Sequence, residues 1–464
     1  MSSLTALIMA AGAGTRMRSS LPKVAHPVCG RPMIAWSVAA AREAGADRIC
    51  AIVSPDRDLS GVLPDGVETV IQPTADGTGG ALRAALPVIA DSGLVLVLSG
   101  DQPLVSAEEI EMLRDESNAS GAEAVLLTAE LEDPGAYGRV IRSPDGSVEK
   151  IVEAKEPGDA TPDELAVREV NAGTYLFQAE ALADALGEIS NDNSQGEYYL
   201  PDVLPAMREA GKTIAACVTD AVAVGVNDKI ELAAVEAEAR KALLEGHMRA
   251  GVTVVDPAST WIDADVEIAE DVRIEPGCSI KGATAIKAGA LIGPHSTLID
   301  SKVGERSEVR NSHLDSCTIG DGVLVGPFAH IRPGTELADG SKVGSFVEIK
   351  NSRIGKGAKV PHLSYVGDAD VGEESNLGAA TITANYDGKE KHRTKIGRKV
   401  RTGVDTTLVA PVEVGDEAYT GAGSVIIEDV PPGALGIGRP EQHNVEGYSD
   451  RKREATDREE GNEE

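Results

Sequence analysis

The sequence predicts an α/β domain, with a Rossmann-like mixed sheet between helices, followed by a left-handed parallel β-helix. Three observations predict this fold class. Strand-like and helix-like segments alternate through the first half, a long helical segment runs from 228 to 248, and aliphatic residues recur every six positions between Ile262 and Leu377. Alternating strands and helices are typical of a parallel sheet with helices on its faces. A six-residue period is typical of hexapeptide repeats, in which each short strand and its turn form one side of a coil.

The six-residue period is carried by two unbroken runs of branched aliphatic residues. The first comprises Ile262, Ile268, Ile274, Ile280, Ile286, Ile292 and Leu298, and the second Ile319, Val325, Ile331, Leu337, Val343 and Ile349. Neither the two-residue alternation of a strand nor the 3.6-residue period of a helix explains this spacing, and chance spacing is the weaker explanation. We expect the aliphatic side chains to point inward and stack from coil to coil. Gly, Asn, Asp and Ser should fill the corners, where a positive φ is often needed.

Composition narrows the class of protein and its partners. The chain has 464 residues, enough for two or three domains, and a net charge of −31, which argues against nonspecific nucleic-acid binding. Local clusters of Lys and Arg still allow phosphorylated small molecules as substrates, and solubility is the simplest reason for the acidity. The five cysteines have no C-x-x-C spacing, and no apolar run is long enough for a membrane helix. A reducing, cytoplasmic location without membrane contact is therefore expected.

A glycine-rich turn follows the first predicted strand. Leu4–Met9 is apolar and leads into A-A-G-A-G-T-R-M at 10–17. Glycines let backbone N–H groups approach phosphates closely, and Arg16 adds positive charge. The turn has neither the P-loop pattern nor the G-x-G-x-x-G pattern. Lys23 lies just beyond it, in L-P-K-V. An ordinary tight turn and a solvated lysine are the alternative interpretations.

The next segments extend the α/β pattern. Met33–Ala44 has apolar residues at helical spacing, Ile49–Val53 is strand-like, and Gln72–Ala81 is a second glycine-rich loop before a helix. This alternation favours a parallel sheet whose loops gather at one edge.

Asp101 lies in S-G-D-Q-P-L, shortly after the fully apolar segment Leu94–Leu98. Such a segment is typical of a buried central strand, and open α/β sheets bind ligands at the carboxyl ends of their strands. A carboxylate at that edge, facing phosphates, is suited to Mg²⁺. The alternative is that Asp101 caps the following helix, but Ser106, immediately before A-E-E-I-E-M-L, is the better N-cap.

These motifs and several later ones occur in an order that resembles the sugar-1-phosphate nucleotidylyltransferase family. The later ones are Y-G-R-V at 137–140, I-V-E-A-K at 151–155, N-A-G at 171–173, E-Y-Y-L at 197–200 and G-V-N at 225–227. With the long helical segment and the repeats, the chain resembles the bifunctional N-acetylglucosamine-1-phosphate uridylyltransferase/glucosamine-1-phosphate N-acetyltransferase family over about residues 4–440.

For the first half, the resemblance implies Mg²⁺-assisted attack of a sugar phosphate oxygen on the α-phosphorus of UTP, with Arg16 and Lys23 offsetting phosphate charge. It implies that the nucleotide is bound by Ala10, Ala11, Gly12, Lys23, Gln72, Gly77 and Thr78, the metal by Asp101 and Asn227, and the sugar by Gly138, Glu153 and Asn171. The family usually has Leu before G-T-G and His after it, where this chain has Asp76 and Gly80. Asp76 adds negative charge near the nucleotide and leaves the choice between UTP and dTTP open.

Polar side chains and one long loop interrupt the repeat half. Arg332, Lys350, His362 and Tyr365 lie in polar insertions, and a polar, partly basic loop within 376–395 breaks the six-residue stride. Its basic residues favour an anionic partner such as CoA or a sugar phosphate. His362 is the candidate general base for amide formation, because a neutral imidazole can take the proton of an attacking amine near pH 7. The alternative is a corner histidine that is hydrogen-bonded locally.

For the second half, the resemblance implies acetyl transfer from acetyl-CoA with His362 as the base. It implies that glucosamine-1-phosphate is bound by Arg332, Lys350, Tyr365, Asn376 and Lys391, and acetyl-CoA by Ala379, Asn385, Tyr386, Val404, Ala422 and Arg439. Two positions depart from the family pattern. Ala380 replaces the second Gly of G-A-G-T, and Val404 replaces the Ser of G-S-D-T, which removes a hydroxyl from the CoA site. The sequence therefore supports acetyl transfer less firmly than uridylyl transfer.

The expected organisation has four parts. They are a nucleotidylyltransferase domain at 1–227, a linker helix at 228–250, a β-helix acetyltransferase domain at 251–440 and a charged, disordered tail at 441–464. Hexapeptide domains of this family are trimers, so we expect a homotrimer with the acetyl-transfer site between subunits. A monofunctional nucleotidylyltransferase with a structural or regulatory β-helix is the alternative, favoured by Val404. A non-catalytic scaffold is opposed by the intact nucleotide motifs.

Overall fold

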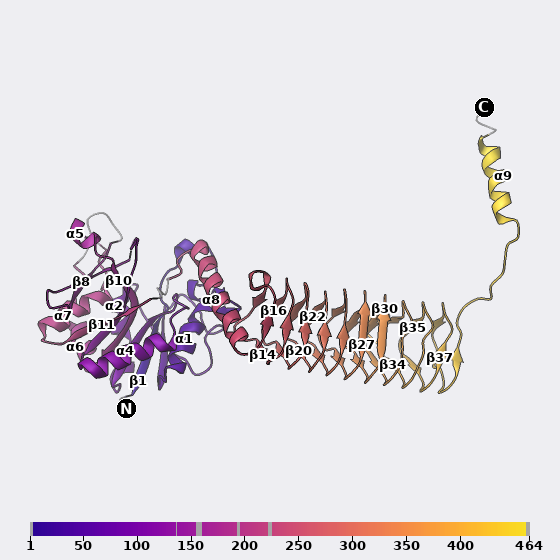
Figure 1. The fold of residues 1–464 in the computed structure, drawn as a ribbon, viewed down its shortest axis with the longest axis horizontal. Helices are drawn as coiled ribbons and strands as arrows, with labels where there is room; N and C mark the ends of the chain where they lie inside the picture. Colours follow the sequence, from indigo (N-terminus) through magenta and orange to yellow (C-terminus); the bar gives the residue numbers. More distant parts are fainter. Residues whose placement is uncertain (1–2, 136, 155–159, 193–194, 221–224, 461–464) are drawn as a thin grey trace. The chain divides into compact units, whose positions relative to one another are not determined.

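The computed structural model describes residues 3–135, 137–154, 160–192, 195–220 and 225–460, with side chains described as far as 456. Lys155 of the I-V-E-A-K motif and the last four residues of the tail lie outside this part. The chain forms two compact units, Met1–Gly246 with Ile262–Asp265 and His247–Trp261 with Val266–Glu464 (Figure 1). None of the helices within the described residues has the length and apolar character needed to cross a membrane.

The first unit is built on a mixed sheet with strand order β11-β7-β10-β6-β1-β4-β5. The strands are β1 Leu4–Met9, β4 Arg48–Val53, β5 Glu68–Ile71, β6 Leu94–Ser99, β7 Ala124–Glu130, β10 Glu169–Gln178 and β11 Ile214–Thr219. Strand β10 runs antiparallel to β6 and β7, whereas the other neighbours are parallel. The hairpin β8 Arg139–Arg142 and β9 Val148–Val152 joins the sheet through β10. This confirms the predicted mixed α/β sheet with β6 at its centre.

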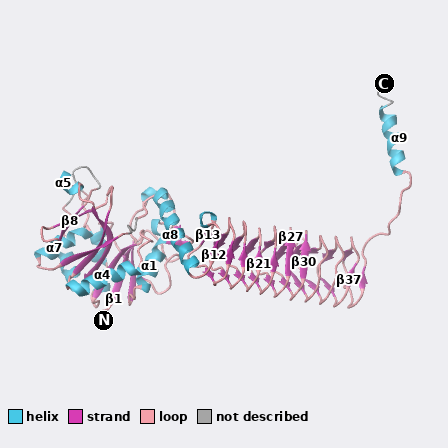
Figure 2. Ribbon diagram, in the orientation of Figure 1, coloured by secondary structure: helices cyan, strands magenta, loops and turns pink. Residues whose placement is uncertain are grey.

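Helices flank this sheet (Figure 2), namely α1 Met33–Glu43, α2 Thr78–Ala84, α4 Ala107–Ser120, α6 Ala179–Glu188 and α7 Val203–Glu209. Leu96 and Val97, neighbours on β6, lie in separate apolar clusters, so the central strand is buried on both faces. Helix α4 begins with a capping box, in which the Glu109 N–H donates to Ser106 Oγ at 3.2 Å and the Ser106 N–H donates to Glu109 Oε2 at 2.9 Å. Ser106 is therefore the cap, as predicted, and Asp101 is not needed for it.

The long helix α8 spans Lys229–Arg249. It begins after Asp228, whose Oδ1 accepts the backbone N–H groups of Ile230 and Glu231 at 2.8 and 2.9 Å. Val235 and Ala239 are buried in an apolar cluster that includes Val28 and Met33. Helix α8 therefore packs into the apolar core of the first unit, and it also connects the segments on either side of it.

The second unit is a parallel β-helix of three sheets, each named here by one of its strands. The β30 sheet contains β12 Thr253–Val254, β15 Arg273–Ile274, β18 Leu291–Ile292, β21 Glu308–Val309, β24 Leu324–Val325, β27 Lys342–Ser345 and β30 Lys359–His362. The β31 sheet continues from β16 Ser279–Lys281 through β19 Thr297–Ile299, β22 His313–Asp315, β25 His330–Ile331, β28 Glu348–Lys350, β31 Tyr365–Gly367, β33 Ile382–Ala384, β35 Thr407–Val409 and β38 Val425–Ile426. The β34 sheet contains β14 Glu267–Ile268, β17 Ala285–Ile286, β20 Lys302–Val303, β23 Thr318–Ile319, β26 Glu336–Leu337, β29 Arg353–Ile354, β32 Ala369–Val371, β34 Thr394–Ile396 and β36 Val412–Val414.

The aliphatic ladder forms the core of this β-helix, as predicted. Each six-residue step moves to the next sheet, and every third step returns to the same sheet one coil along. In the β31 sheet the stacked, fully buried series is Ile280, Leu298, Leu314, Ile331 and Ile349. Burying such side chains contributes roughly 1.5–3 kcal/mol each relative to exposure, so the stack is the main source of stability for this unit.

The corners differ in part from the prediction. Asp300, Asn311 and Ser316 have positive φ there, as expected of small polar residues. Phe328 and Phe346 also adopt positive φ, at 60° and 57°, and their exposed rings stack with centroids 5.4 Å apart. Left-handed backbone is unfavourable for bulky side chains, so the stacked coils hold these corners in place.

The charged tail was expected to be disordered, whereas the structure has a helix in part of it. Helix α9 spans Tyr448–Glu460, and its described residues are exposed. Arg453 pairs with Asp450, and the Lys452 ammonium lies over the Tyr448 ring. Long charged side chains lose little freedom in a helix, so a segment with few apolar residues can still be helical.

Candidate active sites

A cleft of about 640 Å³ lies in the first unit, where β1, β4, β5 and β6 end. The predicted site residues that line it are Ala10, Ala11, Gly12, Lys23, Gln72, Gly77, Thr78, Asp101, Glu153 and Asn171. The carboxyl ends of neighbouring parallel strands meet at one edge of a sheet, which is why residues far apart in sequence converge here.

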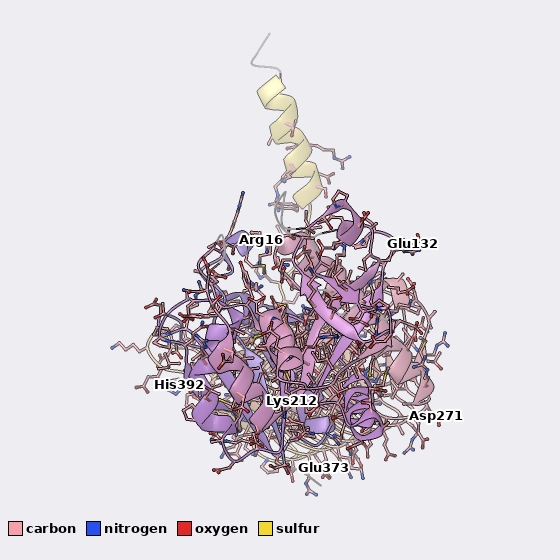
Figure 3. The ribbon with its side chains drawn as sticks, turned by 90° about the vertical axis from the view of Figure 1, so that its left-hand side faces the viewer. Arg16, Glu132, Lys212, Asp271, Glu373 and His392 are labelled. Atoms are coloured by element: carbon pink, nitrogen blue, oxygen red, sulfur yellow. The ribbon has the colours of Figure 1, made fainter. Side chains whose placement is uncertain are left out.

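Lys23, Asp101 and Asn227 form a charged cluster in this unit together with Arg16. Lys23 Nζ makes an ion pair with Asp101 Oδ2. Asn227 Oδ1 accepts hydrogen bonds from Arg16 Nη2 at 2.9 Å and from Lys23 Nζ at 3.4 Å. The exposed Arg16 side chain is labelled in Figure 3. Two oxygen atoms from segments far apart in sequence thus face the same ammonium group.

The backbone around this cluster fixes its geometry. The Asn227 N–H donates to Glu231 Oε2 at 2.6 Å, and Asn227 Nδ2 donates to the Gly225 carbonyl at 3.1 Å, which directs Oδ1 towards the cations. Gly14 has a φ of +60°, and a Cβ there would lie 2.7 Å from the Lys23 Cβ. Glycine is therefore required where the 10–17 loop passes Lys23.

Asp101 and Asn227 provide a donor set that suits Mg²⁺. No group of three or more His, Cys, Asp or Glu in the described residues is placed to hold a metal. Mg²⁺ is commonly held by only one or two carboxylates together with substrate phosphates and water. Because Asp101 Oδ2 and Asn227 Oδ1 already face one cation, the Lys23 ammonium, the residues present fit this mode of binding.

Gln72, which lines the cleft, is hydrogen-bonded to Asp76. Gln72, which is buried, donates from Nε2 to Asp76 Oδ1 at 2.8 Å and to the Gly77 carbonyl at 3.0 Å. A Cβ at Gly80 would lie 2.0 Å from Asp76 Oδ1. The two departures from the family pattern, Asp76 and Gly80, are therefore in contact.

The three predicted sugar-binding residues come from one region of the sheet. The Asn171 N–H donates to the Gly138 carbonyl at 2.9 Å, and Asn171 Nδ2 donates to the Tyr175 hydroxyl at 2.6 Å. Glu153 and Asn171 line the cleft, whereas Gly138 contacts Asn171 through the backbone hydrogen bond given above.

Sequence reasoning missed Arg57, which lines the same cleft. Arg57 Nη1 donates to the Gly12 carbonyl at 2.8 Å, across the loop predicted to wrap phosphates. The residue follows strand β4 in S-P-D-R. The strand-end rule that singled out Asp101 could have found it.

In the second unit, four predicted residues gather on and beside the β31 sheet. The Lys350 ammonium lies beside that of Lys391 and lowers the pKa of Lys391. Asn385 Nδ2 lies 3.5 Å from the Tyr365 hydroxyl. A Cβ at Gly367 would lie 2.4 Å from that hydroxyl, so only glycine leaves room for the Tyr365 side chain. Two adjacent ammonium groups beside polar side chains suit an anionic sugar derivative.

Asp368 organises this group, and the sequence analysis assigned it no role. Its two carboxylate oxygens accept hydrogen bonds from Asn385 Nδ2 and Asn351 Nδ2, each at 2.5 Å. Asp368 is buried and has a φ of 50°. Arg332, one coil away from Lys350, pairs with Glu348 at 2.6 Å, another residue that sequence reasoning missed. Glu348 lies two residues before Lys350, which is a signal that could have singled it out, whereas the residues next to Asp368 in sequence give no such signal.

Four of the six predicted CoA residues lie along one corner of the coils. The Asp405 N–H donates to the Ala379 carbonyl at 2.7 Å, and the Gly423 N–H donates to the Val404 carbonyl at 2.8 Å. Arg439 Nη1 donates to the Ala422 carbonyl at 2.6 Å. Ala379, Val404 and Ala422 thus occupy successive coils, and the Val404 side chain is about half exposed.

The remaining predicted residues lie at other positions. His362 ends β30 and pairs with Ser345 through the backbone, and its exposed imidazole makes no hydrogen bond or ion pair within the part of the chain described. Asn376 pairs through its backbone with Lys359 of the same sheet in an isolated parallel β-bridge. Tyr386 is exposed on the loop after β33 and bridges Lys391. Within a single chain, His362 is therefore not in contact with the Lys350 group.

Comparison with known proteins matches both halves of the chain. Residues 6–200 match the family described as MobA-like NTP transferase domain. Residues 316–351 match the family described as bacterial transferase hexapeptide (six repeats). The two matches fall on the mixed sheet with its cleft and on the β-helix.

Relatives match almost the whole chain. Bifunctional protein GlmU of Mycolicibacterium vanbaalenii is 48% identical over 459 residues, covering 96% of this chain and 93% of the relative. The proteins of that name from Kineococcus radiotolerans and Streptomyces coelicolor are 49% and 46% identical, covering 97% and 96% of this chain and 92% and 94% of the relatives. The chain therefore belongs to the GlmU family of bifunctional enzymes, which combine a uridylyltransferase with an acetyltransferase.

Proposed function

We propose that the cleft of the first unit joins UTP to N-acetylglucosamine-1-phosphate, and that the second unit makes this sugar phosphate by acetylating glucosamine-1-phosphate. The observation that carries the proposal for the first unit is the convergence of Arg16, Lys23, Asp101 and Asn227. Two cations and two oxygen ligands at the carboxyl end of β6 suit a reaction in which phosphate charge must be held and shifted.

Uridylyl transfer needs positioning and charge stabilisation rather than a nucleophilic side chain. An oxygen of the sugar phosphate forms a bond to the α-phosphorus of UTP, and the bond from that phosphorus to pyrophosphate breaks. Arg16 and Lys23 neutralise the phosphates, while Gln72, Gly77 and Thr78 hold the base. Mg²⁺, held by Asp101 and Asn227, would supply further charge at the phosphate oxygens. Glu153 and Asn171, with Gly138 behind them, bind the sugar.

Acetyl transfer needs a base and two binding surfaces. The sugar amine attacks the thioester carbon, the carbon–sulfur bond breaks, and His362 takes the amine proton while the CoA thiolate leaves. Arg332, Lys350 and Lys391 bind the sugar phosphate, and Tyr365 and Asn376 hold the sugar. Acetyl-CoA lies along the corner formed by Ala379, Val404 and Ala422, with contacts to Asn385, Tyr386 and Arg439.

We further propose that the protein is a homotrimer. Support comes from the separation of His362, on the β30 sheet, from Lys350, on the β31 sheet. A neighbouring subunit would bring the base of one chain to the sugar-phosphate site of the next. The exposed, stacked Phe328 and Phe346 lie on neighbouring coils and provide apolar surface for such packing.

The division into domains at 1–227, 228–250, 251–440 and 441–464 is also proposed, as is a cytoplasmic location. The boundary near 227 is supported by the start of α8 directly after Asp228. The location is supported by five cysteines that form no disulfide.

Two variants test the two sites separately. Lys23→Ala should lower pyrophosphate release from UTP and N-acetylglucosamine-1-phosphate by roughly 10- to 150-fold, because a charged hydrogen bond to phosphate is lost. His362→Ala should lower thiol release from acetyl-CoA and glucosamine-1-phosphate, and each variant should keep the other activity. Lys212→Ala and His443→Ala are matched controls. If Lys23→Ala retains pyrophosphate release within twofold of the unmodified enzyme, the proposed nucleotide site is wrong.

A further inference from the structure

The Gln72 side chain is held in one orientation. Its Nε2 carries two protons, and these are directed to Asp76 Oδ1 at 2.8 Å and to the Gly77 carbonyl at 3.0 Å. The reverse orientation would place the amide oxygen against a carboxylate and a carbonyl, both of which are acceptors. Oε1 is therefore the group that Gln72 offers to the cleft, and it can only accept a hydrogen bond.

An acceptor at this place discriminates between pyrimidines. Uracil presents the N3–H donor at the middle of its pairing edge, whereas the N3 atom of cytosine is an acceptor. An Oε1 that faces N3 binds uracil and is repelled by cytosine. A buried polar group left unpaired costs binding free energy, so this mismatch reduces the use of CTP. Thymine has the same N3–H, so the contact does not separate UTP from dTTP.

We propose that Asp76 is a positioning residue that fixes the Gln72 amide and thereby strengthens the selection of uracil over cytosine in this cleft. The inference rests on the proposed function, in which Gln72 holds the base. Where the family has Leu, this chain has a carboxylate that supplies one of the two acceptors for Nε2. The negatively charged carboxylate of Asp76 is thus hydrogen-bonded to the Gln72 amide.

Gly80 leaves the space that the contact between Asp76 and Gln72 needs. A Cβ at this position would lie 2.0 Å from Asp76 Oδ1 and 2.4 Å from its Cγ, so a side chain there would push the carboxylate away from Gln72. The two departures are therefore linked, because a carboxylate held at this place by Gln72 leaves no room for a side chain at 80. Gly80 also provides a second, independent way to disturb the Gln72 amide.

The test is the ratio of kcat/KM for UTP to that for CTP, measured by pyrophosphate release in the full-length enzyme. Asp76→Leu should lower this ratio roughly tenfold, the effect of about one hydrogen bond. Asp76→Asn, which can still offer Oδ1 to Gln72 Nε2, should keep it. Gly80→Ala should also lower the ratio, and adding it to Asp76→Leu should lower it little further, because both changes release the same contact. A merely structural role for Asp76 would lower both kcat/KM values together and leave their ratio unchanged.

A Gln72→Ala variant separates failure of this inference from failure of the proposed function. If Gln72→Ala changes the ratio while Asp76→Leu and Gly80→Ala leave it within twofold of the unmodified enzyme, Asp76 does not position Gln72. If Gln72→Ala also leaves the ratio unchanged, Gln72 does not hold the base and the proposed nucleotide site must be revised. Thermal unfolding of each variant shows whether a lost activity reflects loss of the fold.

Discussion

Replacing Asp101 with Asn removes one negative charge from the cluster and leaves its volume almost unchanged. The Asp101 and Lys23 side chains are 21% and 14% exposed, so water screens their charges only in part. A unit charge at about 4 Å from a cation contributes ~4 kcal/mol at an effective dielectric constant near 20. The amide oxygen of Asn retains part of this, and we expect a loss of roughly 2–3 kcal/mol. That loss corresponds to a fall of about 30- to 150-fold in kcat/KM.

The assay is pyrophosphate release at a series of MgCl₂ concentrations. In Asp101→Asn the curve should shift to higher MgCl₂, because the weakened ligand is Asp101, and added metal should restore part of the activity. Asp56→Asn is the matched control, since Asp56 lines the same cleft outside the Lys23 cluster. Thiol release from acetyl-CoA should be unchanged in both variants. Coincident MgCl₂ curves for Asp101→Asn and the unmodified enzyme would refute the assignment of Asp101 to the metal.

Three further predictions concern other parts of the chain. Val404→Ser should restore a hydroxyl on the CoA corner and raise kcat/KM for acetyl-CoA about fivefold, as one hydrogen bond would, with thiol release as the measurement and pyrophosphate release unchanged. Burial and the Lys229 ammonium lower the pKa of His26 below its usual 6.5. His26 therefore contributes stability above pH 6.5 that is lost as the pH falls below this value. The unfolding temperature of the protein should drop between pH 7 and 5, and it should drop less in His26→Gln. Burial raises the pKa of four thiols to about 11 or 12, those of Cys29, Cys50, Cys217 and Cys317. At pH 8 these thiols should react slowly with a thiol reagent in the native protein and rapidly in denaturant.

Periodic parts of the fold were predictable because they depend on local pattern. The six-residue ladder, the central strand β6 and the Ser106 cap each follow from residues close together in sequence, and the structure confirms them. The position of Asp101 near the end of β6 followed in the same way. Helix α9 was missed because its residues are mostly charged. A high content of charged residues with few apolar ones indicates disorder by composition, and composition alone does not separate a charged helix from a charged coil.

Contacts between distant segments were not predictable. The sequence placed Lys23 and Asp101 in one site through family resemblance, but it did not indicate that they pair, because no local pattern links residues in different loops. The contact of Asp76 with Gln72 was also missed, although the two residues are only four positions apart, and the sequence suggested only added charge near the nucleotide. Asp368 was missed because its partners, Asn351 and Asn385, lie on neighbouring coils.

Three of the proposed site residues of the β-helix lie at one kind of position in the coil. His362, Ala379 and Val404 each directly precede a residue with left-handed backbone, the φ values of Leu363, Ala380 and Asp405 being 51°, 58° and 55°. Each such corner costs roughly 1–2 kcal/mol for a residue other than glycine, and the buried aliphatic stack offsets this cost. Because the side chain before the corner points away from that stack, it can change without disturbing the core. Val404 therefore alters the chemistry offered to acetyl-CoA and leaves the fold intact, which is why Val404→Ser should change one activity and not the stability of the unit.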